Sequence, residues 1–131
     1  MSQKIGYIAL LVREYDEAIA FYTNCLGFRI VEDTDLGGGR RWVLVAPQNT
    51  EGTALLLAKA STPEQTEHIG NQTGGRVFLF LHTSHFWRDY ATMQERGVQF
   101  MEEPRQENYG TVAVFQDLYG NRWDLLELAR T

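Results

Sequence analysis

The sequence has 131 residues, within the range of about 100–200 residues for one ordinary domain, so we do not expect two full domains. Apolar residues make up 44% of it, enough to build a core, which excludes a disordered chain. The net charge is −5, and the densest basic cluster is the pair Arg40 and Arg41. A phosphate backbone needs a larger basic surface, so we expect no nucleic-acid partner.

The apolar runs are too short for a membrane protein. The longest, residues 7–12 and 77–81, have five or six residues, whereas a spanning helix needs about 18 or more. Residues 1–4 lead directly into a strand-like stretch and do not resemble a secretion signal. The single cysteine, Cys25, allows no internal disulfide. We therefore expect a soluble cytoplasmic protein with no membrane contact.

The first half of the chain predicts a helix followed by three strands, after an initial strand over residues 5–13. The helix is predicted by apolar side chains at helical spacing, namely Ala18, Phe21, Tyr22, Cys25 and Leu26. Gly27 stands where a left-handed residue would end it. Strands are predicted over residues 28–32, 41–46 and 53–58, with a turn at Gly37-Gly38-Gly39. This half reads as a βαβββ unit.

The second half repeats the same order after a polar linker, residues 61–75, which predicts one helical turn. A strand is predicted over residues 76–83, Ser84 as an N-cap, a helix over 86–96 ending at Gly97, and a last strand over 122–128. Gly27 and Gly97 are 70 residues apart (97 − 27), and residues 41–45 match residues 111–115 at the same offset. We infer an internal duplication and an α+β fold.

Two sequence motifs connect this duplication to a known family. Ala20-Phe21-Tyr22 precedes Leu26-Gly27-Phe28, and residues 117–125 read Asp-Leu-Tyr-Gly-Asn-Arg-Trp-Asp-Leu. With the two βαβββ units, they resemble the vicinal oxygen chelate superfamily of glyoxalases, bleomycin-resistance proteins and extradiol dioxygenases. The resemblance implies one domain over residues 1–131, in which modules 4–60 and 76–128 form a cup-shaped, partly open barrel. It also implies a homodimer.

The resemblance assigns four positions to metal ligands in the metal-dependent members, and here they hold Tyr7, Leu56, Phe78 and Asp124. Leucine and phenylalanine have no lone pair to donate, tyrosine is an uncommon ligand, and one carboxylate holds a divalent ion weakly. We therefore expect no cofactor. The alternative is a divalent metal at a non-standard site.

Asp124 is the candidate catalytic residue. Strand alternation places it on one face with Leu126, and the resemblance implies that this face lines the pocket. A carboxylate among apolar side chains loses solvation, which raises its pKa unless a partner compensates. Asp124 is then able to hold a cationic or donor group of a ligand, or to act as a general base. Alternatively, it pairs internally with Tyr7 or with an arginine such as Arg41.

Aromatic side chains supply a surface on which a flat ligand would stack, although the same rings also suit a core. The full ligand-binding prediction is Tyr7, Trp42, Leu56, Phe78, Phe80, His82, Tyr109 and Asp124. His82 shares strand parity with Phe80 and is placed at the pocket rim. His82 and His85 point to opposite faces unless the chain has already turned helical, and His68 lies in the linker, so we expect no histidine metal site.

Three functions stay open at this point. The preferred one is a glyoxalase/bleomycin-resistance-like protein that binds a small organic ligand, basic or aromatic, without the usual metal quartet. The second is a metal-dependent lyase, isomerase or dioxygenase of the same superfamily that uses Asp124 and His82. The third is an interaction protein whose cup is filled by its own side chains. Whether the protein is an enzyme is not decided by the residues.

Overall fold

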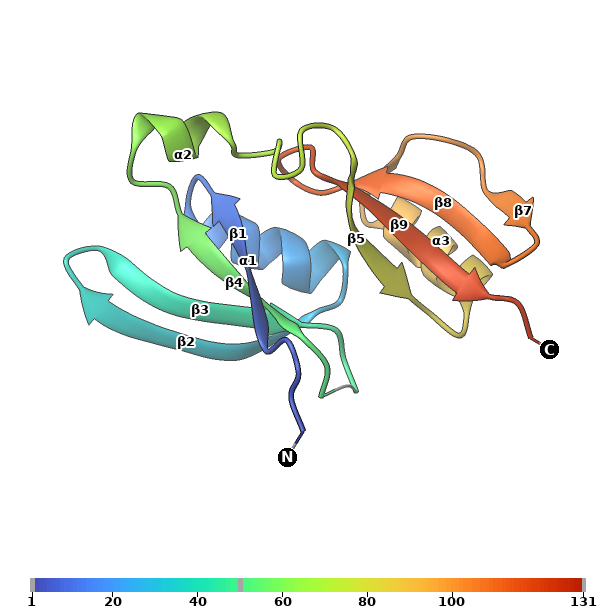
Figure 1. Cartoon of the computed structure of the whole chain (residues 1–131), viewed down its shortest axis with the longest axis horizontal. Coiled ribbons are helices and arrows are strands. Elements are labelled where there is room, and N and C mark those ends of the chain that lie inside the picture. Colours follow the sequence, from blue (N-terminus) through green and yellow to red (C-terminus); the bar gives the residue numbers. More distant parts are fainter. Residues whose placement is uncertain (1, 50, 131) are drawn as a thin grey trace. The chain divides into compact units, whose positions relative to one another are not determined.

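The computed structural model describes residues 2–49 and 51–130, and the chain forms two compact units, Met1–Ile69 and Gly70–Thr131 (Figure 1). Each unit has one sheet and is described by itself below. The expected α+β composition is confirmed. Among the described residues, no helix is both long and apolar enough to cross a membrane.

Unit 1 (Met1–Ile69) has a four-stranded sheet in the order β1-β4-β3-β2. The parallel pair β1 and β4 sets Ala9 opposite Leu56. The elements are β1 (Tyr7–Val12), α1 (Tyr15–Ala20), η1 (Phe21–Cys25), β2 (Arg29–Gly37), β3 (Arg40–Ala46), β4 (Ala54–Lys59) and α2 (Pro63–Glu67). The predicted order is confirmed, with a longer β2 than expected.

The predicted first helix changes its winding halfway. Its second part, η1, is a π-helical turn in which the amide of Leu26 donates to the carbonyl of Phe21 over 3.3 Å. Gly27 follows with φ of 73°, which confirms the left-handed residue that ends the helix. The π turn keeps the helix's apolar side chains on the sheet, since Tyr22 is fully buried.

Both faces of the unit 1 sheet are apolar. On the side that faces the helix, alternate residues of β1 and β3 are fully buried, among them Leu10, Val12, Val43 and Val45. The opposite side carries a cluster of Leu44, Ala46 and Ala54, against which Trp42 and Leu56 pack. Alternation along the strands therefore places the predicted ligand-binding residues of this unit on the face away from α1.

Unit 2 (Gly70–Thr131) repeats this plan with one difference. Its sheet has the order β5-β9-β8-β6, and a further short strand, β7, also pairs with β8. The elements are β5 (Val77–His82), α3 (Phe86–Glu95), β6 (Gln99–Phe100), β7 (Arg105–Glu107), β8 (Gly110–Gln116) and β9 (Arg122–Leu128). Where the repeat predicts a single strand, β6 and β7 are separate. Between them, the carboxylate of Glu102 accepts the amide of Val114 over 3.2 Å, so a side chain replaces a backbone partner.

The predicted cap of the second helix is wrong by one residue, because His85 and not Ser84 precedes α3. The first amide of the helix, on Phe86, donates to the Glu127 carboxylate of β9 over 2.8 Å. The hydroxyl of Thr83 accepts the His85 amide over 3.0 Å. The carboxylate of Glu127, distant in the sequence, therefore caps the helix in place of the predicted Ser84.

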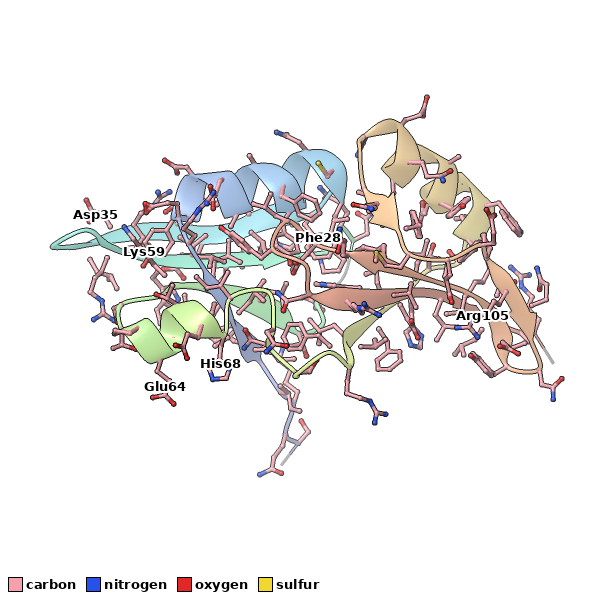
Figure 2. The ribbon with its side chains drawn as sticks, turned by 90° about the horizontal axis from the view of Figure 1, so that it is seen from above. Phe28, Asp35, Lys59, Glu64, His68 and Arg105 are labelled. Atoms are coloured by element: carbon pink, nitrogen blue, oxygen red, sulfur yellow. The ribbon has the colours of Figure 1, made fainter. Side chains whose placement is uncertain are left out.

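The linker forms the single helical turn that was predicted. In α2 the Thr62 hydroxyl accepts the amide of Gln65 over 3.1 Å, and Pro63 occupies the first turn. His68 ends this helix, so its predicted place in the linker is confirmed (Figure 2).

The family motif at residues 117–125 builds a turn between β8 and β9. Asp117 and Asn121 are the buried polar side chains of this turn. One oxygen of Asp117 accepts the amides of Tyr119, Gly120 and Asn121 over 2.9–3.1 Å, and the other accepts the Asn121 side-chain amide over 3.0 Å. Asn121 in turn accepts the amide of Gln72 over 3.0 Å. The motif thus links Gln72, near the start of unit 2, to the turn that precedes β9.

Candidate functional site

The structure brings together three predicted residues on the outer face of the unit 1 sheet. Trp42 of β3 and Leu56 of β4 pack on the same apolar cluster. The Tyr7 ring of β1 meets the Trp42 ring edge-on, with 6.2 Å between centroids and 78° between planes. Tyr7 is 56% exposed, so this face offers aromatic surface to a ligand.

In unit 2, Asp124 stands in the middle of the sheet. Phe80 of β5 lies opposite it on one side and Val114 of β8 on the other. Phe80 is 58% exposed, and the exposed His82 lies opposite Leu126, further along the same face. Phe78, in contrast, falls in a register irregularity between Val77 and Leu79. The direct neighbour of Asp124 is therefore Phe80.

The two units share the register of these positions. Leu56 lies opposite Ala9, two residues after Tyr7, and Asp124 lies opposite Phe80, two residues after Phe78. The duplicated alignment used for the four metal-ligand positions therefore matches the strand pairing. Because the register agrees, the side chains at these positions can be compared directly.

The Asp124 carboxyl group is in an unfavourable electrostatic environment. Its Oδ1 atom is buried and has no hydrogen-bond partner among residues 2–49 and 51–130. Burial raises the pKa of Asp124 above its ordinary value, the positive charge of Arg105 lowers it, and the negative charge of Glu102 raises it again. The raised pKa expected from strand alternation is confirmed in direction.

Glu102 and Arg105 are site residues that the sequence analysis missed. The Arg105 guanidinium donates to Glu102 over 3.0 Å and also binds Glu107 (Figure 2). The bond to Glu102 is the main cause of the raised pKa of Arg105, and a hydrogen bond with the half-exposed Tyr109 contributes. Arg105 is thus engaged by other groups and compensates Asp124 only through space. The charged stretch over residues 102–107 is the sequence signal that could have indicated this cluster.

The structure gives Arg41 partners other than Asp124. The Arg41 guanidinium lies 2.7 Å from Asp16 and 2.7 Å from Asp33, and it stacks over the Tyr15 ring at 5.3 Å from the centroid. The hydrogen bond to Asp33, followed by that to Asp16, raises the pKa of Arg41. All of these partners belong to unit 1.

The residues present do not fit a metal centre of the usual kind. Of the four positions, Tyr7, Leu56, Phe78 and Asp124, only the last offers a strong ligand to a hard cation. In the part of the chain that the structure describes, no group of three or more His, Cys, Asp or Glu side chains could hold a metal ion. His82 and His85 belong to different elements, the end of β5 and the start of α3.

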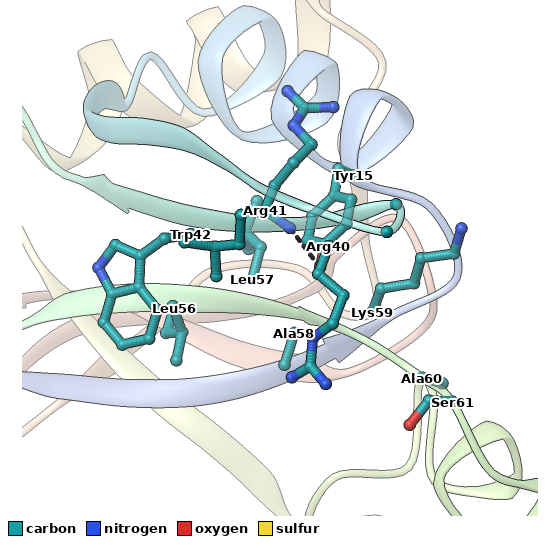
Figure 3. Close-up of a pocket in the computed structure, with 13 residues that line it drawn as sticks. Tyr15, Arg40, Arg41, Trp42, Leu56, Leu57, Ala58, Lys59, Ala60 and Ser61 are labelled. Atoms are coloured by element: carbon teal, nitrogen blue, oxygen red, sulfur yellow. Dashed lines mark hydrogen bonds between the residues drawn. The ribbon is translucent and has the colours of Figure 1, made fainter.

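Trp42 and Leu56 also line a cleft within unit 1. Its volume is about 460 Å³, and it lies between the hairpin end of β3 and the last residues of β4 (Figure 3). Apart from Trp42, none of the aromatic residues predicted to bind ligand lines this cleft.

Comparison with known proteins gives relatives over nearly the whole chain. An uncharacterized protein of Shewanella frigidimarina is 58% identical over 129 residues, covering 98% of this chain and 96% of that protein. The crystal structure of UcmS2 superposes with a TM-score of 0.83 at 31% identity, covering 96% of this chain and 98% of that one. The crystal structure of TnmS3, an antibiotic binding protein from Streptomyces sp. CB03234, gives a TM-score of 0.78 at 29% identity, with 98% of both chains covered.

A family model also matches residues 4–125, which cover most of both units and include the Asp117–Asn121 turn. The resemblance drawn from the sequence is thereby confirmed. The chain belongs to the glyoxalase/bleomycin resistance protein/dioxygenase superfamily.

Proposed function

We propose that this protein binds a small organic molecule that carries an aromatic body and a basic or hydrogen-bond-donating group. The observation that carries the proposal is the buried, unpartnered Oδ1 atom of Asp124 beside the exposed ring of Phe80. A relative described as an antibiotic binding protein, TnmS3, supports the same class of function.

The energetic argument concerns what a ligand would relieve. A buried acceptor without a partner costs about 1–3 kcal/mol, and a cationic donor would form a charge-assisted hydrogen bond with it. The exposed ring of Phe80, in the same sheet as Asp124, supplies apolar area for the rest of the ligand. Aromatic contact therefore provides affinity for many compounds, and Asp124 selects among them.

Binding in this proposal uses no metal, because leucine and phenylalanine replace two of the four ligand positions. If the bound molecule also reacts, Asp124 is the proposed general base, since its raised pKa moves it toward the range in which a carboxylate accepts a proton usefully. His82, on the same face, is proposed as a rim contact.

The test compares two probes of the same shape, naphthylmethylamine and naphthylmethanol, by titration calorimetry. The amine is expected to bind the wild type about tenfold tighter than the alcohol, and Asp124→Asn removes this preference. Glu64→Gln, which removes an exposed acid from α2, is the control for net charge and leaves the preference unchanged. Equal binding of amine and alcohol by the wild type would contradict the proposal.

A further inference from the structure

The cleft in unit 1 lies where the ladder between two neighbouring strands stops. β3 and β4 pair only at Leu44 with Leu56 and at Val45 with Leu55, although β3 continues to Arg40 and β4 to Lys59. A cleft of about 460 Å³ lies beside these strands, lined by residues 40–42 of β3 and 56–59 of β4 (Figure 3).

Tyr15 of α1 occupies the place of the missing strand pairing. The amides of Ala54 and Ala60 donate to β1 and to the residues flanking it, so alternation directs those of Leu57 and Lys59 toward β3. A continued ladder would set Arg41 opposite Lys59. Instead, the Tyr15 hydroxyl accepts the Arg41 amide over 3.2 Å, and the Arg41 guanidinium covers the Tyr15 ring. The Tyr15 hydroxyl therefore takes the place of a β4 partner for the Arg41 amide.

The cleft presents one unpaired cation beside an apolar wall. Trp42, Leu56 and Ala58 lie on the same face of the two strands, and so does Arg40 (Figure 3). Arg40 is exposed and has no ion pair with any described residue. Lys59 lies 2.8 Å from Glu14, and Arg41 points to the other side of the strand, toward α1. Arg40 is thus available to a ligand, whereas the other two cations of the cleft are not.

The acid on this face does not compete for Arg40. Glu32 of β2 lies opposite Leu44 and accepts the Thr34 hydroxyl over 2.9 Å. Leu44 is four residues from Arg40, or about 13 Å along β3. Arg40 itself lies opposite Gly37, which has no side chain to pair with it.

We propose that this cleft binds an aromatic carboxylate, with the ring against Trp42 and Leu56 and the carboxylate on Arg40. Residues 40 and 42 are two positions apart on one strand, about 6–7 Å, so the long Arg40 side chain can reach a carboxylate attached to a ring that lies on Trp42. The inference goes beyond the proposed function, since it gives unit 1 a ligand of opposite charge, and it rests on the prediction that Trp42 and Leu56 contact ligand. It adds an acid-recognising group that does not involve Asp124.

The experiment titrates naphthoate and its neutral analogue naphthamide by calorimetry. Naphthoate is expected to bind the wild type about tenfold tighter than naphthamide, and Arg40→Gln abolishes this difference. Lys59→Gln removes a cation from the same cleft and changes naphthoate affinity by less than about twofold, because Lys59 is already paired. Circular dichroism melting of Arg40→Gln checks that the variant is folded.

Three results would overturn the inference: equal affinities of acid and amide in the wild type, equal losses in Arg40→Gln and Lys59→Gln, or no naphthoate binding at millimolar concentration. Asp124→Asn separates this inference from the proposed function, because it is expected to leave naphthoate affinity unchanged. If amine binding ignores Asp124 but naphthoate binding depends on Arg40, the cleft inference stands and the proposal for Asp124 falls.

Discussion

The two units have the same strand register but different chemistry on equivalent positions. Leu56 in unit 1 and Asp124 in unit 2 occupy the same place in the last strand of each repeat. Leu56 packs into an apolar cluster, while Asp124 leaves a buried oxygen without a partner. The two halves thus share a backbone pattern, while one of them carries a polar atom that has no partner in its own unit. Such a group is the natural place to look for a ligand.

Among the differences between the two units, the one between the turns that precede their last strands should have the largest effect on stability. Asp117 holds three amides and a side chain in unit 2, whereas the position 68 residues earlier, Asn49, is exposed. Asp117→Ala is expected to lower the free energy of unfolding by about 2–4 kcal/mol, and Asn49→Ala by about 1 kcal/mol or less. Urea denaturation of both variants measures this, and equal losses would show that the motif is not a structural anchor.

Glu102 marks the second difference, because it interrupts the strand that is continuous as β2 in unit 1. Glu102→Ala removes the acceptor of the Val114 amide and is expected to destabilise the protein by about 1–2 kcal/mol. It also removes a negative charge near Asp124 and frees Arg105 from one partner, so the pKa of Asp124 falls. A carbon-13 NMR titration of the aspartate carboxyls follows this change. An Asp124 pKa that rises in the variant would be inconsistent with the charges described.

Asp124→Asn should stabilise the protein at neutral pH, by up to about 1 kcal/mol, because it removes a desolvated charge. Since the folded pKa of Asp124 is raised above 3.8, the native state binds more protons than the unfolded state between that value and the folded pKa. The wild type therefore gains stability from this group as the pH falls through the folded pKa, and its difference from Asp124→Asn narrows.

Thermal melts of both proteins between pH 3.5 and 8 test this dependence. Asp35→Asn, at an exposed acid of the β2 strand, serves as a control that shows no comparable gain at neutral pH. A wild type that is less stable than Asp124→Asn at low pH and more stable than it at high pH would contradict the predicted sign.

The smallest effect is expected from metal removal, since the four ligand positions hold a single carboxylate. Protein purified without chelators should contain well below one divalent metal per chain, and EDTA should leave the melting temperature unchanged. Elemental analysis checks this. A stoichiometric divalent metal that is lost in Asp124→Ala would instead favour the metal-dependent reading of the family.

Much of the fold was predictable because it rests on local periodicity. The strands follow apolar runs, Gly27 and Gly97 both adopt positive φ, and the repeat offset reproduces the observed register. The raised pKa of Asp124 was also predictable, since alternation alone places it on a sheet face.

Three of the missed features depend on side chains that bind distant backbone. Glu127 caps α3 from another element, Glu102 replaces a strand partner of Val114, and Tyr15 takes the Arg41 amide. These contacts join residues 12 to 41 positions apart and leave no periodic trace in the sequence. Three-dimensional coordinates are needed to find them, including the contact of Tyr15 with Arg41 at the unit 1 cleft.

The most direct test of the central claim is the titration of the Asp124 carboxyl by NMR, with and without naphthylmethylamine. We predict a pKa above 3.8 in the free protein and a downward shift when the amine binds, because the cation stabilises the carboxylate. A pKa at or below 3.8 in the free protein, unmoved by saturating amine, would contradict the account.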